Sequence, residues 1–161
     1  MRKIVFALMV VMMLCTVSQA PAAAGPVSLP KGYESWEKSR QKIVEDKKSL
    51  FYGVHYIYLD KKGMKAYKGG GSYPEGSRFV VVYHNLKDEA GKLVEGKKNM
   101  VVLMQRDKKQ TETGGWLFAG YSADGKPSGI DPLKNCFSCH QKDAADRQFV
   151  ISKYEDFSVK K

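Results

Sequence analysis

Cysteines and long apolar runs are both scarce in this sequence of 161 residues. One of the three cysteines, Cys15, falls within the one long apolar run, residues 4–17, which follows two basic residues. A basic start, an apolar run of this length and small residues at positions 18–24 are typical of a secretory signal peptide. The sequence therefore predicts that residues 1–24 are a signal peptide, cleaved after residue 20 or 24. Because no run is long enough to span a bilayer comfortably, an integral membrane protein is excluded.

The sequence also lacks distant cysteine pairs. Once the leader is removed, only Cys136 and Cys139 remain, and they lie three positions apart. A framework of disulfides, which many exported domains of this size use, is therefore excluded. Stability must come from an apolar core or from a bound cofactor. We expect residues 25–161 to form a single periplasmic domain.

Acidic residues are outnumbered: 27 lysines and arginines face 17 aspartates and glutamates, which gives a formal net charge of +10. The lysines are scattered in pairs along the chain, and no nucleic-acid-binding motif accompanies them. Together with export, this excludes a nucleic-acid partner. The basic surface suits an acidic redox partner.

Helical spacing is seen near both ends of the mature chain. Tyr33, Trp36, Ile43 and Val44 predict an N-terminal helix over residues 33–48. Near the other end, an aspartate followed by a proline predicts a helix from Pro132 through about Asp146. A short third helix, begun by Asp60 and ended by the glycines at 69–71, is expected between them.

Four segments rich in aromatic and β-branched residues predict strands. They cover residues 51–59, 78–83, 99–105 and 116–121. Because strands and helices do not alternate regularly, a parallel sheet is disfavoured. We therefore expect an α+β fold: a mainly antiparallel β-sheet with an N-terminal helix and a C-terminal helix.

The C-terminal helix carries the sequence Cys136-Phe137-Ser138-Cys139-His140. Cys-x-x-Cys-His is the attachment signature of a c-type haem. On a helical turn, the two cysteines reach the two vinyl groups of one porphyrin, and the adjacent histidine points its imidazole at the iron. The motif predicts one covalently attached haem c, with thioethers at Cys136 and Cys139 and with His140 as the proximal iron ligand.

Two other interpretations of this motif are weaker. A redox-active Cys-x-x-Cys site normally opens a helix after a buried strand of a parallel sheet, and no such architecture is indicated here. A zinc site needs further cysteine or histidine ligands at suitable spacing, and the only other histidines, His55 and His84, lie far upstream.

The second axial position of the iron decides the function. No methionine or histidine follows His140, so a distal protein ligand would have to come from upstream. The candidates are Met64, Met100, Met104, His55 and His84. Nothing in the sequence demands one of them, so we expect an open coordination site; a six-coordinate electron-transfer cytochrome c is an alternative. The strand-rich segments argue against the four-helix bundle in which C-terminal haem motifs also occur.

The order of these features resembles the cytochrome P-460 family, including its β-sheet cytochromes c′ (cytochrome c′-β). The resemblance implies a haem packed on a large antiparallel sheet, and a homodimer. It is carried by seven segments in order along the chain: 29–33, Trp36, 58–60, 74–76, 115–116, 136–140 and 149–151.

Hydroxylamine-oxidising members of this family carry a lysine that is cross-linked to the porphyrin, and the matching position here is Val81. No lysine occurs within residues 77–86, and no carboxylate occurs within 99–105, where those enzymes carry a distal carboxylate. The pocket arginine of those enzymes matches His55, which would be a distal acid or base if it reached the pocket. The resemblance therefore favours a gas-binding protein over an oxidoreductase acting on hydroxylamine or nitric oxide, which stays the alternative.

The gas-binding branch of the family covers the iron with phenylalanines. Phe79 lies two residues before Val81 and hence on the same face of its strand, and Phe51 on the preceding strand is the expected second member. Nitric oxide and carbon monoxide bind ferrous iron without a hydrogen-bond donor, so an apolar cover suits them. The sequence thus predicts a periplasmic monohaem cytochrome with five-coordinate haem that binds nitric oxide and carbon monoxide for sensing, scavenging or transport.

Overall fold

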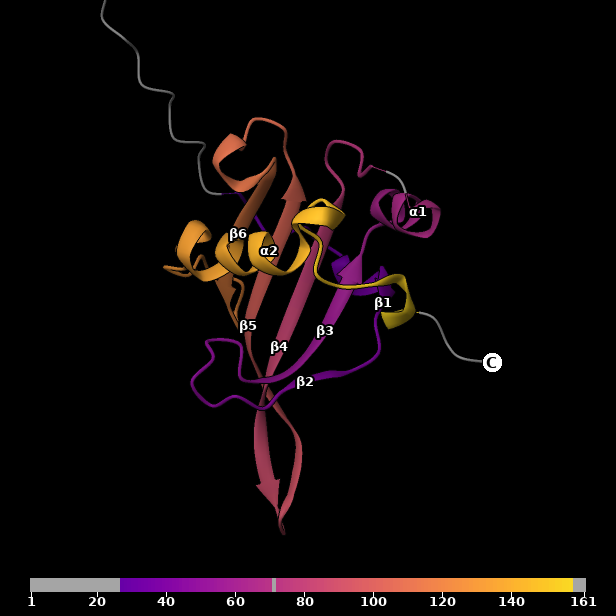
Figure 1. Ribbon diagram of the computed structural model, residues 1–161. Coiled ribbons are helices and arrows are strands. Elements are labelled where there is room, and N and C mark those ends of the chain that lie inside the picture. Colours follow the sequence, from indigo (N-terminus) through magenta and orange to yellow (C-terminus); the bar gives the residue numbers. More distant parts are fainter. Residues whose placement is uncertain (1–26, 71, 158–161) are drawn as a thin grey trace, which may run out of the picture.

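The computed structural model describes residues 27–70 and 72–157, and the predicted signal peptide lies outside these residues. A six-stranded antiparallel sheet forms its centre, in the order β1-β3-β4-β5-β6, with β2 also pairing with β3 (Figure 1). With a helix at its C-terminal end, this confirms the predicted α+β fold and excludes a helical bundle. The strands are β1 (Glu37–Lys38), β2 (Lys42–Val44), β3 (Gly53–Leu59), β4 (Arg78–Glu89), β5 (Lys92–Arg106) and β6 (Trp116–Ser122).

The register of the central strands sorts their side chains onto two faces. Val81 pairs with Ile57 on β3 and with Val102 on β5. Phe79 pairs with Leu59 and Met104 in the next row. Because residues paired across antiparallel strands share a face, one side of the sheet is lined by these rows.

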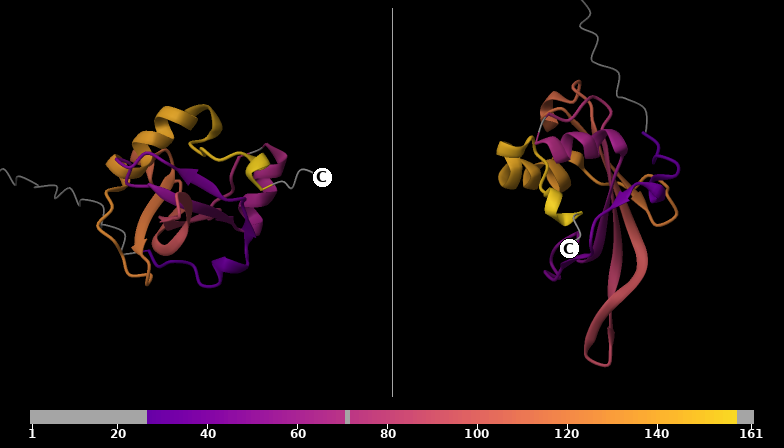
Figure 2. Two further views of the ribbon diagram at one scale, coloured as in Figure 1. Left: turned by 90° about the horizontal axis from the view of Figure 1, so that it is seen from below. Right: turned by 90° about the vertical axis from the view of Figure 1, so that its right-hand side faces the viewer.

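The opposite face is covered by the start of the described chain. Its buried core contains Val80, Val82, Val101 and Leu103, which alternate with the residues named above. The segment from Val27 to Trp36 packs on this core, on the side of the sheet away from the C-terminal helix (Figure 2). Two apolar layers therefore sandwich the sheet.

The predicted N-terminal helix over residues 33–48 is wrong. Only the single 3-10 turn η1 (Tyr33–Ser35) is helical, and β1 and β2 follow it. Lys42 pairs with His55, and Val44 pairs with Gly53. β-branched side chains at 43 and 44 suit an edge strand, and pairing with β3 satisfies the backbone in place of helical hydrogen bonds.

Helix α1 (Lys61–Gly69) confirms the predicted short helix. The Asp60 carboxylate accepts a hydrogen bond from the Gly63 amide at 2.7 Å, and the same carboxylate faces Arg78 at 3.3 Å. Gly70 ends the helix with a φ of 62°, a left-handed conformation that favours glycine. Both ends of α1 are therefore set by local residues that the sequence reveals.

Strands β4 and β5 extend well beyond the predicted ranges. They form one long hairpin whose tip projects beyond the rest of the molecule (Figures 1 and 2). Apart from the turn residues Ala90 and Gly91, residues 86–99 belong to these two strands, with Glu89 paired with Lys92.

The predicted C-terminal helix is present but is built from different turns. A π-helical segment, η3 (Pro132–Phe137), leads directly into α2 (Ser138–Ala144) and the 3-10 turn η4 (Ala145–Arg147). Asp131 begins it by accepting hydrogen bonds from the amides of Leu133 and Lys134 at 3.0 and 3.1 Å. The whole segment lies against one face of the sheet (Figure 2). Two further 3-10 turns are η2 (Thr111–Thr113) and η5 (Tyr154–Asp156).

Candidate functional site

A cavity of about 210 Å³ lies between the sheet and the C-terminal helical segment. Side chains of four strands form one wall: Ile57, Phe79, Val81, Tyr83, Val102, Met104 and Phe118. The facing wall comes from the chain around α2: Asn135, Cys136, Cys139, His140, Val150, Ile151 and Ser152. Lys42 and Phe51 complete the lining. The structure therefore brings together six of the seven residues that the sequence singled out.

The imidazole of His140 is held in a defined orientation. Its Nδ1 atom lies 2.6 Å from the carbonyl oxygen of Phe149, so Nδ1–H is the donor. The ring of Phe118 meets it edge-on, with ring centroids 5.0 Å apart. Burial lowers the pKa of His140, so the ring is neutral and its Nε2 lone pair is available to a metal.

The backbone that supplies this carbonyl is strained. Gln148 and Phe149 both adopt left-handed conformations, with φ of 53° and 64°. The Phe149 amide donates to Ala144 at 2.7 Å, and the Trp116 indole donates to the Gln148 carbonyl at 2.8 Å. Non-glycine residues hold such conformations only when their surroundings enforce them. These two backbone conformations position the Phe149 carbonyl beside the His140 imidazole.

Cys136 and Cys139 reach the same cavity from successive turns and are both free thiols. Cys136 is buried, and burial raises its pKa to about 11. A thiol of this kind is poorly suited to disulfide exchange, which needs a readily formed thiolate. Within the described part of the chain, no three His, Cys, Asp or Glu side chains gather as a metal site. The pair and His140 instead match a covalently held haem.

His55 lies beside the cavity and not in its lining. Its ring is tilted against that of Tyr83, with centroids 5.2 Å apart, and the two residues pair across β3 and β4. Burial, and secondarily the charge of Lys42, lowers the pKa of His55 to about 4. Its Nδ1 atom is buried with no hydrogen-bond partner in the described structure. His55 is therefore neutral, and it projects from the same face of the sheet as Tyr83 and Ile57 without lining the cavity.

Sequence reasoning missed several residues of the lining, and the polar ones on the side of the sheet are Tyr83 and Lys42. Tyr83 continues the alternation of Phe79 and Val81, a signal that was present in the sequence. Lys42 was hidden by the incorrect helix, because only the pairing of β2 with β3 brings it to the cavity. Its Nζ atom lies 2.8 Å from the carboxylate of Asp156.

Of the upstream candidates for a second iron ligand, only Met104 lines the cavity. Met104 is buried in the core cluster that also contains Met64. His84 is engaged elsewhere, 3.1 Å from Glu95.

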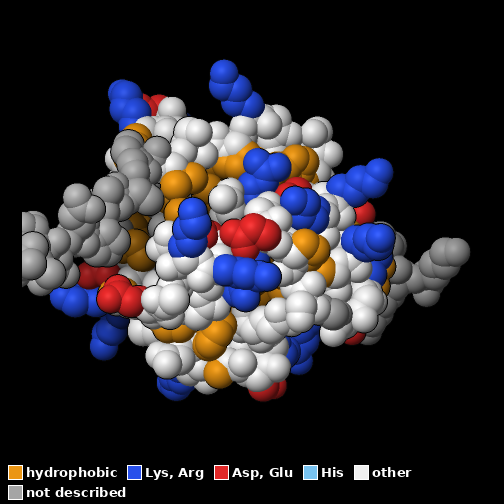
Figure 3. Space-filling model, turned by 90° about the horizontal axis from the view of Figure 1, so that it is seen from above, with side chains coloured by type: hydrophobic (Ala, Val, Ile, Leu, Met, Phe, Trp, Pro, Cys, Tyr) orange, Lys and Arg blue, Asp and Glu red, His pale blue; other side chains and the backbone are white. Residues whose placement is uncertain are grey.

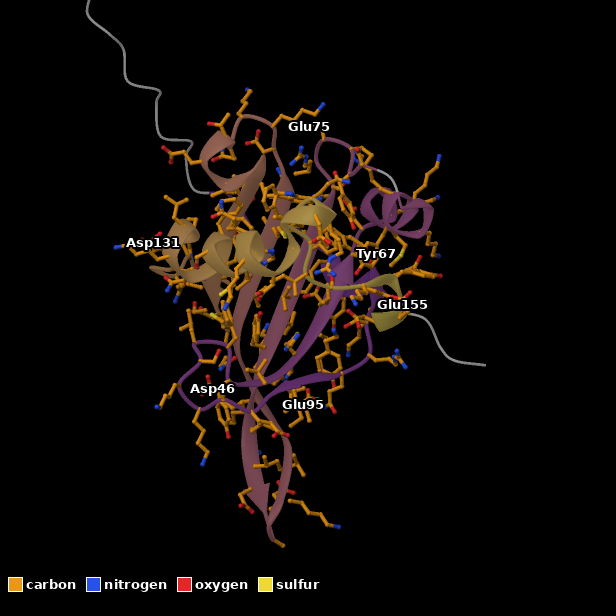
Figure 4. All side chains as sticks on the ribbon, in the orientation of Figure 1. Asp46, Tyr67, Glu75, Glu95, Asp131 and Glu155 are labelled. Atoms are coloured by element: carbon orange, nitrogen blue, oxygen red, sulfur yellow. The ribbon has the colours of Figure 1, made fainter. Side chains whose placement is uncertain are left out.

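Carboxylates are absent from the lining of this cavity. The acidic residues labelled in Figure 4 lie around the edges of the sheet and its covering segments: Asp46, Glu75, Glu95, Asp131 and Glu155. On the face shown in Figure 3, lysines and arginines are dispersed and interspersed with acidic side chains. The described surface on that side thus offers scattered positive charge and no continuous basic track.

Among known protein families, the family model described as Cytochrome P460 matches residues 30–152 of this chain. A comparison with curated proteins found no match. The matched region includes every residue that lines the cavity.

Proposed function

We propose that this chain, which belongs to the cytochrome P-460 family, binds nitric oxide at its haem and does not oxidise hydroxylamine. Proteins of this family carry a covalently attached haem c, and the chain is accordingly a haem-binding cytochrome. Within the described residues, none of the helices is long or apolar enough to cross a bilayer. The proposal concerns which ligand binds to the haem.

The residues around the cavity suit the cofactor. Cys136 and Cys139 would hold it through thioethers, and the Nε2 atom of His140 would bind its iron. The hydrogen bond to Phe149 fixes the histidine tautomer and makes the ring a better donor to a metal. When bound, the haem would supply an iron coordination site for a diatomic gas.

One observation carries the choice of ligand: the sheet wall of the cavity is almost entirely apolar. Phe79, Val81 and Val102 line it, and Phe51 closes one end. Such a wall keeps water out and leaves the gas without a positioned acid or base. Nitric oxide and carbon monoxide need neither, since they bind ferrous iron as neutral molecules.

Hydroxylamine oxidation is the second candidate, because Lys42 lines the cavity. Several features count against it. The position that matches the cross-linked lysine is Val81, Lys42 comes from a different strand, and its ammonium is paired with Asp156. The proton transfers of that reaction also need a carboxylate, which the lining lacks. An intact-mass measurement that detects a lysine–haem cross-link would favour this candidate.

The proposal also covers the location, the oligomeric state and the redox partner of the protein. We place it in the periplasm, exported by residues 1–24, as a homodimer that serves in sensing, scavenging or transport of nitric oxide and has an acidic redox partner. The signal-peptide pattern of residues 1–24, the basic composition and the family resemblance support these assignments. Sedimentation of the purified haem protein at several concentrations tests the dimer.

The decisive experiment is the visible spectrum of the ferric and ferrous protein, with and without nitric oxide. We expect high-spin, five-coordinate iron in both oxidation states and a ferrous nitrosyl spectrum after gas addition. A low-spin spectrum that becomes high-spin in Met104→Leu would contradict the proposal and identify a six-coordinate electron carrier.

A further inference from the structure

We propose that Tyr83 determines ligand specificity: its phenolic hydroxyl donates a hydrogen bond to anionic ligands bound in the haem cavity. This inference rests on the proposed function, because it requires an open iron coordination site. It assigns the otherwise apolar sheet wall of the cavity one polar group, and with it a second class of ligand, small anions on ferric iron.

The position of Tyr83 on β4 directs it to the cavity. It follows Phe79 and Val81 at intervals of two residues, so all three project from the same face of the strand, and all three line the cavity. Pairing with His55 on β3 fixes the register of this part of the strand.

Aromatic neighbours hold the ring of Tyr83 in place. Phe51 stacks against it with ring centroids 5.2 Å apart and planes inclined by 30°. His55 packs at the same centroid distance with an inclination of 36°. A ring with two such contacts loses little further freedom when its hydroxyl meets a ligand, which is the condition for an effective preorganised donor.

The hydroxyl itself is available. Across residues 27–70 and 72–157 the structure gives it no hydrogen-bond partner, whereas Tyr56 and Tyr121 each bond through theirs. Burial raises the pKa of Tyr83 well above its usual value, so the group keeps its proton. The hydroxyl oxygen is not among the fully buried atoms that lack a partner, so it stays accessible to a ligand that accepts its hydrogen bond.

Charge at this end of the cavity acts in the same direction. Lys42, which also lines the cavity, pairs with His55 across β2 and β3. The Lys42 ammonium pairs with the Asp156 carboxylate at 2.8 Å, and this negative charge partly offsets the positive charge that Lys42 presents to the cavity. The nearby imidazole of His55 is neutral near pH 7 and adds no charge. A cation and a hydroxyl donor together favour a ligand with negative charge over a neutral one.

The test compares Tyr83→Phe with Tyr58→Phe in the intact haem protein. Tyr58 lies on the neighbouring strand and packs against Tyr33 on the opposite face, so its variant controls for the loss of a phenol. The first probe is fluoride binding to the ferric protein, followed in the visible spectrum. We expect Tyr83→Phe to bind fluoride about tenfold more weakly, the usual effect of losing one hydrogen bond to a charged acceptor. Tyr58→Phe should match the unaltered protein.

The second probe needs no anion. The stretching frequency of carbon monoxide on the ferrous iron reports the polarity of its surroundings, and it should rise in Tyr83→Phe and stay constant in Tyr58→Phe. Affinity for nitric oxide should be nearly the same in all three proteins. Haem content measured on each preparation verifies that the variants are folded and loaded.

The outcomes separate the two proposals. If the protein binds nitric oxide but fluoride affinity and the carbon monoxide frequency are unchanged in Tyr83→Phe, the role of Tyr83 is wrong and the proposed function stands. If Tyr83→Phe instead loses haem while the ligand properties of its loaded fraction are unchanged, the hydroxyl binds a carboxylate of the haem and not the ligand. If the unaltered protein binds neither nitric oxide nor fluoride, both proposals fail.

Discussion

The imidazole of His140 donates a hydrogen bond to the carbonyl oxygen of Phe149, with 2.6 Å between the two heavy atoms. The ring of Phe149 in turn lies directly over Gly114, where an added Cβ would overlap it. A loop residue at 114, outside the cavity lining, therefore helps to set the orientation of the residue that we assign to iron binding.

Replacement of Gly114 by alanine should disturb His140 without touching it. The new methyl group must displace the Phe149 ring and thus move its carbonyl, so we expect a shifted iron–histidine band in the resonance Raman spectrum and a lower free energy of unfolding. Gly70→Ala is the control, since Gly70 has nearly the same φ of 62° but open space around it. Gly70→Ala should lower the free energy of unfolding only by the about 1–2 kcal/mol that a left-handed conformation costs alanine. Its iron–histidine band should be unchanged. Equal effects of the two substitutions would contradict the coupling.

Stability should fall on acidification because of His55. Its pKa is about 4 in the folded protein and about 6.5 when unfolded, so between these values the unfolded chain binds more protons. The free energy of unfolding therefore decreases as pH falls from about 6.5 to 4, by up to about 3 kcal/mol. Denaturant titrations at pH 7 and pH 5 should show a smaller decrease for His55→Gln than for the unaltered protein. An identical decrease in both would show that His55 is not the responsible group.

Replacement of Phe79 and of Phe51, the two phenylalanines expected to cover the iron, should lower the free energy of unfolding by different amounts. Phe79 is 3% exposed and packs in the core, so Phe79→Ala should destabilise the protein by about 3–5 kcal/mol. Phe51 is only partly buried and stacks on Tyr83, so Phe51→Ala should cost about 1–2 kcal/mol. Both should speed gas binding in flash photolysis by opening the cavity. Gas-binding rates unaltered in Phe51→Ala would argue that this residue does not cover the iron.

Removal of one thiol should leave the haem attached through the other. Cys139 is exposed and Cys136 is buried, so Cys139→Ser perturbs the fold less than Cys136→Ser. We expect Cys139→Ser to retain covalent haem, with a pyridine haemochrome spectrum that reports one unsaturated vinyl group. The double substitution should release the haem into acidified organic solvent. Covalent haem that persisted in the double variant would contradict the assignment of both thioethers.

Features determined by neighbouring residues were predictable from the sequence. Asp60 and Gly70 delimit α1 through contacts within a few residues, and Asp131 begins the C-terminal helical segment in the same way. The haem motif needs only the spacing of Cys136, Cys139 and His140. The alternation of Phe79 and Val81 on one strand also sufficed to place both in the cavity.

Features determined by distant partners were not predictable in this way. The apolar spacing from Tyr33 to Val44 fits a helix, and only the unpaired edge of β3 makes β2 the better solution. That error concealed Lys42. Whether His55 lines the cavity was equally undetermined, because this depends on how its ring packs against the Tyr83 ring from the next strand.

The order of the two cavity walls along the chain has a consequence for folding. All six strands lie between Glu37 and Ser122, whereas the segment that covers them begins only at Pro132. A chain in which the sheet has paired but this segment has not yet packed would expose Ile57 and Val102, and exposed apolar surface of this kind favours aggregation. The attachment cysteines belong to the same covering segment, so closure of the core and attachment of the haem involve the same residues. Slow haem delivery should therefore lower the yield of folded protein.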